Sequence, residues 1–286
     1  MKELARVAER GEEVQAWVNR HPDELVLKEF ASAPSGPLKG WTLGVKDVID
    51  TCDLPTERGS SIYSGNQPRN DAACVALARE AGATITGKTV TTEFALFTPN
   101  VTRNPHDLKR TPGGSSSGSA AAVADMQVRS ALGTQTVGSV IRPAAFCGVV
   151  GFRPSIGRIP LWPTEMAWHA RLATEGPMAR NVTDCALLLS ALVGFDPRDP
   201  LAIQSNPEIF RKPLERDFSN LKVGWTPDLG ILPMENDIVS VCEATLPIWE
   251  KCNFKVVARA PDLSGAMDCL LYTSDAADEE DSVDLG

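Results

Sequence analysis

Residues 111–148 have the sequence TPGGSSSGSAAAVADMQVRSALGTQTVGSVIRPAAFCG. Residues 111–119 are all Thr, Pro, Gly or Ser. Such residues build no hydrophobic core, but they let a backbone approach a ligand closely and present N–H and hydroxyl groups to it. We therefore expect a ligand-binding or catalytic loop that ends where Gly118 and Ser119 begin an alanine-rich helix.

Strands and helices alternate on both sides of this loop, which predicts an α/β sheet covered by helices. The predicted strands are 14–18, 42–46, 83–86, 129–133, 149–152, 222–225 and 254–258. The predicted helices are 2–11, 72–81 with Asp71 as its cap, 184–193, and 236–251 with a kink at Pro247. We expect all the strands to belong to one sheet.

Composition and charge narrow the class of protein. The 286 residues include 28 Lys and Arg against 37 Asp and Glu, a net charge of −9. A nucleic-acid or anionic-membrane binder needs a positive surface, so neither partner is expected. No segment is apolar for long enough to span a bilayer, and the N-terminal MKELARVAERGEEV has no apolar core of a signal peptide. We expect a cytoplasmic protein.

The seven cysteines are scattered and form no CxxC pair. A zinc site or a disulfide framework needs closer, paired spacings, so we expect no metal, no cofactor and reduced cysteines.

Residues 269–286, CLLYTSDAADEEDSVDLG, differ from the rest of the chain. They are acidic and have no periodicity that would bury a face, so they are either a disordered terminus or a non-native tail. We favour the non-native tail and assign residues 1–268 to the N-terminal portion of a single domain.

Two chemistries fit the glycine- and serine-rich stretch. A phosphate-binding loop would need a lysine before its last Ser or Thr, and none lies between Lys109 and Lys212. Acyl transfer by a serine needs a base and N–H donors for the oxyanion. Ser139 follows the predicted tight turn Thr136-Val137-Gly138, where successive N–H groups can converge, with a helix predicted to begin after it. None of His21, His106 and His169 lies near these motifs in sequence, so a histidine base stays open.

The motifs GGSSSGSAAA and GTQTVGSVIRPAAFCGVVGFRPS resemble those of the amidase-signature family. Ser139 follows Ser115 by 24 residues, and Ser115 follows Lys46, in Gly44-Val45-Lys46-Asp47, by 69 residues. Both intervals are similar to those of that family, particularly its malonamidase-like members. Further matches are Gly87-Lys88-Thr89, Asn104-Pro105 and Gly176-Pro177-Met178-Ala179-Arg180.

The resemblance implies a mixed central sheet covered by helices on both faces, incomplete here because family members continue well beyond this length. It implies amide hydrolysis by a triad of Ser139, a second serine in a cis peptide (Ser115) and Lys46. The backbone N–H groups that would hold the oxyanion are those of Thr136, Val137, Gly138 and Ser139. The implied partner is a small-molecule amide, and a homodimer stays open because the sequence does not give the oligomeric state.

Substrate binding is expected at Arg142, Gln135 and Gly114. Arg142 is placed either to bind a substrate carboxylate or to tie down structural groups, and the sequence does not separate the two. Val137 departs from the family, which usually has glycine there; a β-branched residue would be costly if that position required a positive φ.

Two other functions remain open. One is the amidotransferase subunit that shares this core and acts as a glutaminase within a complex. The other is a C-terminally truncated fragment that keeps the motif and lacks the pocket.

Overall fold

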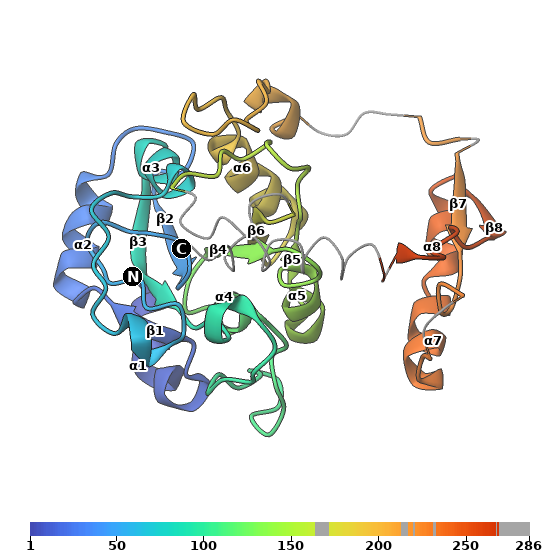
Figure 1. Ribbon diagram of the computed structural model, residues 1–286, viewed down its shortest axis with the longest axis horizontal. Helices are drawn as coiled ribbons and strands as arrows, with labels where there is room; N and C mark the ends of the chain where they lie inside the picture. Colours follow the sequence, from blue (N-terminus) through green and yellow to red (C-terminus); the bar gives the residue numbers. More distant parts are fainter. Residues whose placement is uncertain (164–171, 213–216, 220, 231–232, 267, 269–286) are drawn as a thin grey trace, which may run out of the picture. The chain divides into compact units, whose positions relative to one another are not determined.

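A six-stranded sheet forms the centre of the first part of the chain (Figure 1). The computed structural model describes residues 1–163, 172–212, 217–219, 221–230, 233–266 and 268. The strands are β1 (Trp17–Arg20), β2 (Trp41–Lys46), β3 (Ala83–Thr89), β4 (Ser130–Gln135), β5 (Val150–Gly151) and β6 (Thr174–Ala179). Their order is β1-β3-β2-β4-β6-β5. The sheet is mixed, because β2 is parallel to β3 and β4 while the other pairs are antiparallel.

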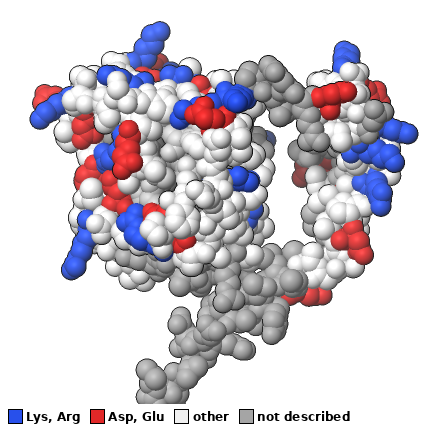
Figure 2. Space-filling view, turned by 90° about the horizontal axis from the view of Figure 1, so that it is seen from above, with Lys and Arg blue, Asp and Glu red and all other residues white. Residues whose placement is uncertain are grey.

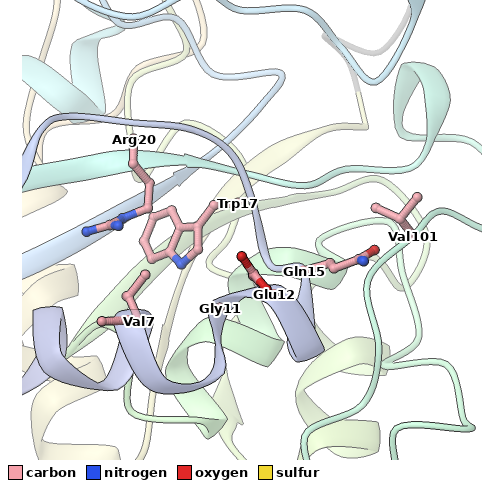
Figure 3. A pocket seen from close by; sticks show the side chains of 8 residues that line it. Val7, Gly11, Glu12, Gln15, Trp17, Arg20 and Val101 are labelled. Atoms are coloured by element: carbon pink, nitrogen blue, oxygen red, sulfur yellow. The ribbon is translucent and has the colours of Figure 1, made fainter.

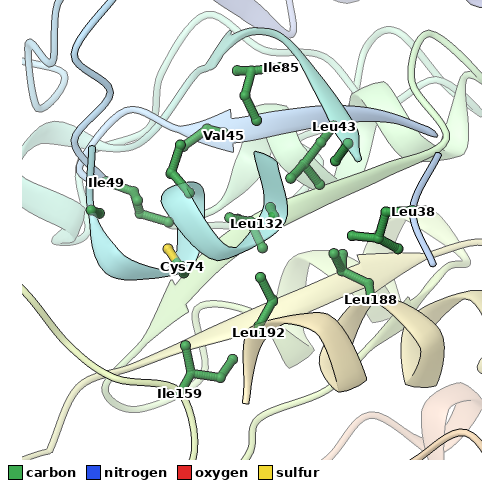
Figure 4. Close-up of a cluster of buried hydrophobic side chains, with 14 of the residues drawn as sticks. Leu38, Leu43, Val45, Ile49, Cys74, Ile85, Leu132, Ile159, Leu188 and Leu192 are labelled. Atoms are coloured by element: carbon green, nitrogen blue, oxygen red, sulfur yellow. The ribbon is translucent and has the colours of Figure 1, made fainter. Parts of the chain in front are cut away.

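Helices cover both faces of this sheet. They are α1 (Lys2–Val14), α2 (Asp23–Ser32), α3 (Ala73–Glu80), α4 (Ser117–Ala124), α5 (Ile141–Cys147) and α6 (Val182–Leu192), with 3₁₀ turns η1 (Ser61–Tyr63), η2 (Glu93–Ala95) and η4 (Pro207–Phe210). Leu132 of β4 packs with α3 and α6 in one core cluster (Figure 4), whereas its neighbour Ala131 packs with α1 and α4 in another. Successive strand residues point to opposite faces, so the two clusters lie on the two sides of the sheet. The predicted fold class is confirmed.

The composition of α4 explains how it lies so close to the sheet. Its sequence, SGSAAAVA, has only small side chains, and every residue from Ser117 to Val123 is buried. A Cβ on Gly118 would lie 2.3 Å from Ala16 O and 2.4 Å from Val90 N. Only glycine fits at that position, and the close approach sets the start of α4 against the strand ends.

The N-terminal elements differ from the sequence prediction. Val14 ends α1 instead of beginning a strand, because Gln15 takes a left-handed conformation (φ 53°) that closes the helix. The strand that follows is Trp17–Arg20. Asp71 does not cap α3; its carboxylate accepts from Cys52 N–H and from Arg79. Helix α2 and strand β6 were not predicted.

The contacts divide the chain into two compact units, Met1–Lys212 and Pro213–Gly286. In the second unit, β7 (Lys222–Trp225) and β8 (Lys255–Ala258) form a separate two-stranded parallel sheet. The prediction that these strands extend the main sheet was wrong. Helices α7 (Asn236–Glu243) and α8 (Leu246–Lys251) replace the single predicted helix, with Pro247 in the first turn of α8. The assignment of residues 1–268 to one domain stays a prediction, and residues 269–286 lie outside the described part.

Candidate active site

Lys46 is the last residue of β2, and its side chain is completely buried. Its Nζ lies 2.6 Å from Ser115 Oγ, 2.8 Å from Thr134 Oγ1 and 3.3 Å from Thr134 O. Among the described residues, no carboxylate forms an ion pair with it. Burial, and then the positive charge of Arg142, hold the pKa of Lys46 well below its usual value of 10.5. The surroundings therefore favour an uncharged amine, whose lone pair can accept the proton of Ser115.

Ser115 lies in the loop before α4 and is completely buried. The Gly114–Ser115 peptide bond is cis. The carbonyl of Ser115 accepts from Thr92 N–H at 3.2 Å, and the carbonyl of Gly114 accepts from Arg142 Nε at 2.9 Å. These contacts hold the loop between the end of β3 and the start of α5.

The turn after β4 carries Ser139. Among the hydrogen bonds of the described residues, the N–H groups of Thr136, Val137, Gly138 and Ser139 have no acceptor. Four successive donors without partners can stabilise a negatively charged oxygen. Val137 is exposed and is not among the described residues with positive φ, so its β-branched side chain causes no strain there.

The structure brings Lys46 and Ser115 into direct contact, whereas Ser139 joins them through its main chain. Ser116 N–H donates to the carbonyl of Ser139 at 3.2 Å, which ties the two loops together. Within the described residues, no hydrogen bond links the hydroxyls of Ser139 and Ser115. Helix α5 begins at Ile141, close to the predicted start.

The three residues expected to bind substrate lie around this turn. Arg142 is exposed, and in the described part of the chain only its Nε has an acceptor, Gly114 O. Gln135 is buried, and its amide bonds to the turn itself. Gly114 lies beside Thr92, whose Cγ2 would be 3.1 Å from an added Cβ. Contact of these residues with substrate stays a prediction.

Two of the three histidines have other partners. His21 Nε2 lies 3.2 Å from Asp53 Oδ2, and His106 Nε2 lies 2.9 Å from the carbonyl of Cys147. His169 lies outside the described residues. Neither described histidine is placed as a base for Ser139.

A second lysine, Lys88 in the Gly87-Lys88-Thr89 motif, is also completely buried, and the sequence did not predict its partners. Its Nζ lies 3.5 Å from Asp47 Oδ1 and 2.5 Å from Thr56 Oγ1. Burial raises the pKa of Asp47 to about 6 even though Lys88 opposes the shift. Lys88 belongs to β3, and Asp47 directly follows Lys46 at the end of β2.

One cavity and one further polar cluster lie outside the motifs that carry Lys46, Ser115 and Ser139. A cavity of ≈ 480 Å³ is lined by α1, Trp17, Arg20 and Val101 (Figure 3). A group of Cys52, Asp53 and Asp71 has the spacing of metal ligands, but Arg79 bonds to both carboxylates.

On the face in Figure 2, acidic and basic side chains are interspersed over the first unit without forming a basic stripe. No described helix has the length and hydropathy of a membrane span.

Known proteins are similar to this chain in sequence and in fold. The family model Amidase matches residues 9–283. The chain is 36% identical over 260 residues to a glutamyl-tRNA(Gln) amidotransferase subunit of Geobacter metallireducens, covering 86% of this chain and 53% of the relative. The same subunit of Thermobifida fusca is 35% identical, and the match covers 92% of this chain and 56% of that relative. The chain thus spans about half the length of the curated relatives it matches.

Solved structures agree with the family match. The corresponding glutamyl-tRNA(Gln) amidotransferase subunit of Thermotoga maritima superposes with a TM-score of 0.83 and 28% identity, covering 100% of this chain and 63% of that one. The peptide amidase of Stenotrophomonas maltophilia superposes with a TM-score of 0.78 and 30% sequence identity, covering 96% of this chain and 62% of that one. A bacterial aryl acylamidase of the amidase-signature family superposes with a TM-score of 0.86 and 25% sequence identity, covering 99% of this chain and 64% of that one. On the family match and these relatives, the chain belongs to the amidase family, as its serine motifs predicted.

Proposed function

We propose that this chain carries the catalytic centre of an amidase that hydrolyses a carboxylic amide to an acid and ammonia. The observation that carries the proposal is the 2.6 Å contact between Lys46 Nζ and Ser115 Oγ, with Lys46 buried and free of a carboxylate partner among the described residues. A lysine in such surroundings can act as a base at physiological pH.

In the proposed mechanism, uncharged Lys46 takes the proton of Ser115 while Ser115 takes the proton of Ser139. The oxygen of Ser139 then attacks the carbonyl carbon of the amide and forms a tetrahedral intermediate. The N–H groups of Thr136 to Ser139, which have no acceptor among the described residues, support the oxyanion. Ser115 returns a proton to the departing ammonia and is reprotonated by Lys46. Water then attacks the acyl-enzyme and releases the acid.

The position of Arg142 favours a negatively charged substrate. It is exposed, its terminal guanidinium nitrogens have no acceptor within the described residues, and its charge reaches Lys46 strongly enough to lower the pKa of that lysine. A carboxylate bound there would lie near the reacting groups. We therefore propose a half-amide, which has one amide and one carboxylate, as the small-molecule substrate. A homodimer and a cytoplasmic location remain proposals from the sequence.

A second candidate is a glutaminase that acts within a complex. It is favoured by the curated relatives, which are subunits of glutamyl-tRNA(Gln) amidotransferases. Glutamine has a carboxylate and a primary amide, so the same site could accept it. Stimulation of glutamine hydrolysis by added partner subunits would distinguish this candidate from a self-sufficient amidase.

The test is ammonia release from malonamate, glutamine and neutral primary amides, with Ser139→Ala as the control. The proposal expects ammonia from at least one amide with the wild-type chain and none with Ser139→Ala. Ammonia release that is unchanged in Ser139→Ala, or none from any amide by a cooperatively folded wild-type chain, would overturn it.

A further inference from the structure

Gln135, the last residue of β4, directs its whole amide group into the turn that follows it. The side chain is 3% exposed. Its Oε1 accepts from Val140 N–H at 2.8 Å and from Ile141 N–H at 2.9 Å. Its Nε2 donates to the carbonyl of Val137 at 3.1 Å. All three partners are main-chain groups of residues 137–141, which comprise the end of the turn that carries Ser139 and the first residue of α5.

These bonds fix the direction of the peptide groups on each side of Ser139. In a trans peptide the C=O and N–H point in opposite directions. Because the carbonyl of Val137 faces Gln135, the N–H of Gly138 in the same peptide must point away from Gln135. Because the N–H of Val140 faces Gln135, the carbonyl of Ser139 must point away, and it accepts from Ser116 N–H at 3.2 Å.

We propose that Gln135 is a positioning residue, which orients the nucleophile turn through its main chain instead of binding the substrate. This inference rests on the proposed function, in which Ser139 is the nucleophile and the N–H of Gly138 helps hold the oxyanion. Gln135 holds that N–H free and aimed away from itself, and it ties the carbonyl side of Ser139 to the loop of Ser115.

The amide of glutamine is the group that this task requires. It offers one oxygen that accepts from two N–H groups and one nitrogen that donates to a carbonyl. A glutamate would keep the acceptor and lose the donor when ionised. A leucine would keep the size and lose both, leaving two N–H groups and a carbonyl of the turn without partners.

The chain offers a matched control in Gln127, which is 1% exposed. Its Oε1 accepts from Trp17 Nε1 at 2.7 Å, and its Nε2 donates to Asp125 at 2.9 Å. Gln127 is thus a buried glutamine whose amide oxygen and nitrogen are both hydrogen-bonded, with no bond to the turn among the described residues. Gln127→Leu measures what the loss of such a side chain does to stability alone.

The experiment compares Gln135→Leu, Gln135→Glu and Gln127→Leu with the wild type. The rate at which a small serine-directed phosphonate labels Ser139 is measured by mass spectrometry, alongside thermal unfolding and the kcat and KM of amide hydrolysis. A small phosphonate needs the oxyanion donors but makes few other contacts, so it separates positioning from substrate binding.

We expect labelling and kcat of Gln135→Leu to fall on the order of 10²–10³-fold, the effect of losing an oxyanion donor, with KM changed less than about threefold. Gln135→Glu should fall between Gln135→Leu and the wild type, and Gln127→Leu should be labelled at the wild-type rate despite its lower unfolding temperature. Labelling of Gln135→Leu as fast as Gln127→Leu would overturn the inference. If Gln135→Leu does not fold, wild-type labelling of Gln135→Glu would do the same. A wild-type chain without labelling at Ser139 contradicts the proposed function itself, and the inference with it.

Discussion

Lys46 and Lys88 lie at the same end of two paired parallel strands, and both are completely buried. Lys88 has the carboxylate of Asp47 at 3.5 Å, whereas Lys46 has only hydroxyl and carbonyl oxygens around its Nζ in the described part of the chain. A nearby carboxylate favours the charged ammonium, and its absence favours the neutral amine. Of the two lysines, Lys46 is therefore the one suited to act as a base.

Replacing Lys46 by Met should abolish activity and raise stability. Because the pKa of Lys46 is lowered in the folded protein, folding must release a proton at any pH between that value and 10.5. Wild-type stability should therefore fall as the pH falls from 10.5 through this window, and the variant should lack this loss. We expect kcat/KM to drop about 10⁴-fold or more. Amide hydrolysis tests the loss of activity, and thermal unfolding at several pH values tests the gain in stability. A Lys46→Met variant that is active, or that is less stable than the wild type at every pH, would contradict the prediction.

Glu175 of β6 should make the fold less stable as the pH rises. Burial raises its pKa from 4.5 to about 7, and the charges of Asp199 and Asp50 add to the shift. The stabilisation from the bound proton is complete below pH 4.5 and is lost as the pH rises to about 7. Each pKa unit corresponds to about 1.4 kcal/mol, so the loss is roughly 3 kcal/mol. In denaturant unfolding, Glu175→Gln should reduce the difference in stability between pH 5 and pH 8, and the part that remains belongs to other groups such as Asp47. A difference between the two pH values as large as that of the wild type would refute the assignment.

Arg142 should discriminate between substrates by charge. Its terminal guanidinium nitrogens have no acceptor in the part of the chain that the structure describes. If they bind a carboxylate, malonamate should be hydrolysed faster than a neutral amide of similar size. Loss of a charged hydrogen bond is worth about 1.5–3 kcal/mol, so Arg142→Leu should lower kcat/KM for malonamate about 10- to 100-fold. The neutral amide serves as the internal control. Equal losses on both substrates would make Arg142 a structural tie to Gly114.

Val137 should be replaceable without loss of activity. Its side chain is 64% exposed and its φ is not positive. Exposed substitutions usually change stability by less than about 0.5 kcal/mol. We expect Val137→Ala to keep kcat and KM within about threefold, as measured by ammonia release. A large fall in kcat would show that the β-branched side chain shapes the oxyanion turn after all.

The sequence predicted most of the fold because its strands and helices have strong local signals. The β2 strand, the small-residue helix α4 and the apolar α6 follow from patterns within one short window. Strand β6 was missed because TEGPMA contains glycine and proline, which local rules assign to loops. It becomes a strand because β4 pairs with it along its whole length and β5 pairs with its end.

The candidate site also has a part that the sequence predicted and a part that it did not. Lys46, Ser115 and Ser139 stood out through motifs and intervals along the chain. The bonds of Gln135 to its own turn, and the pairing of Lys88 with Asp47, depend on backbone geometry and on contacts between strands. Neither can be derived from spacing. Motifs and intervals led to Lys46 as the proposed base, and the three-dimensional contacts add the physical difference from Lys88, which has the carboxylate of Asp47 beside it.

The central claim, that Ser139 is the nucleophile activated through Ser115 by Lys46, is tested most directly by covalent labelling. The protein is treated with a serine-directed phosphonate, and the modified residue is located by peptide mass spectrometry in the wild type, Ser139→Ala and Lys46→Ala. We predict a single adduct on Ser139 in the wild type, no adduct in Ser139→Ala, and labelling slowed by orders of magnitude in Lys46→Ala. An adduct that forms at the wild-type rate in Ser139→Ala would contradict the account.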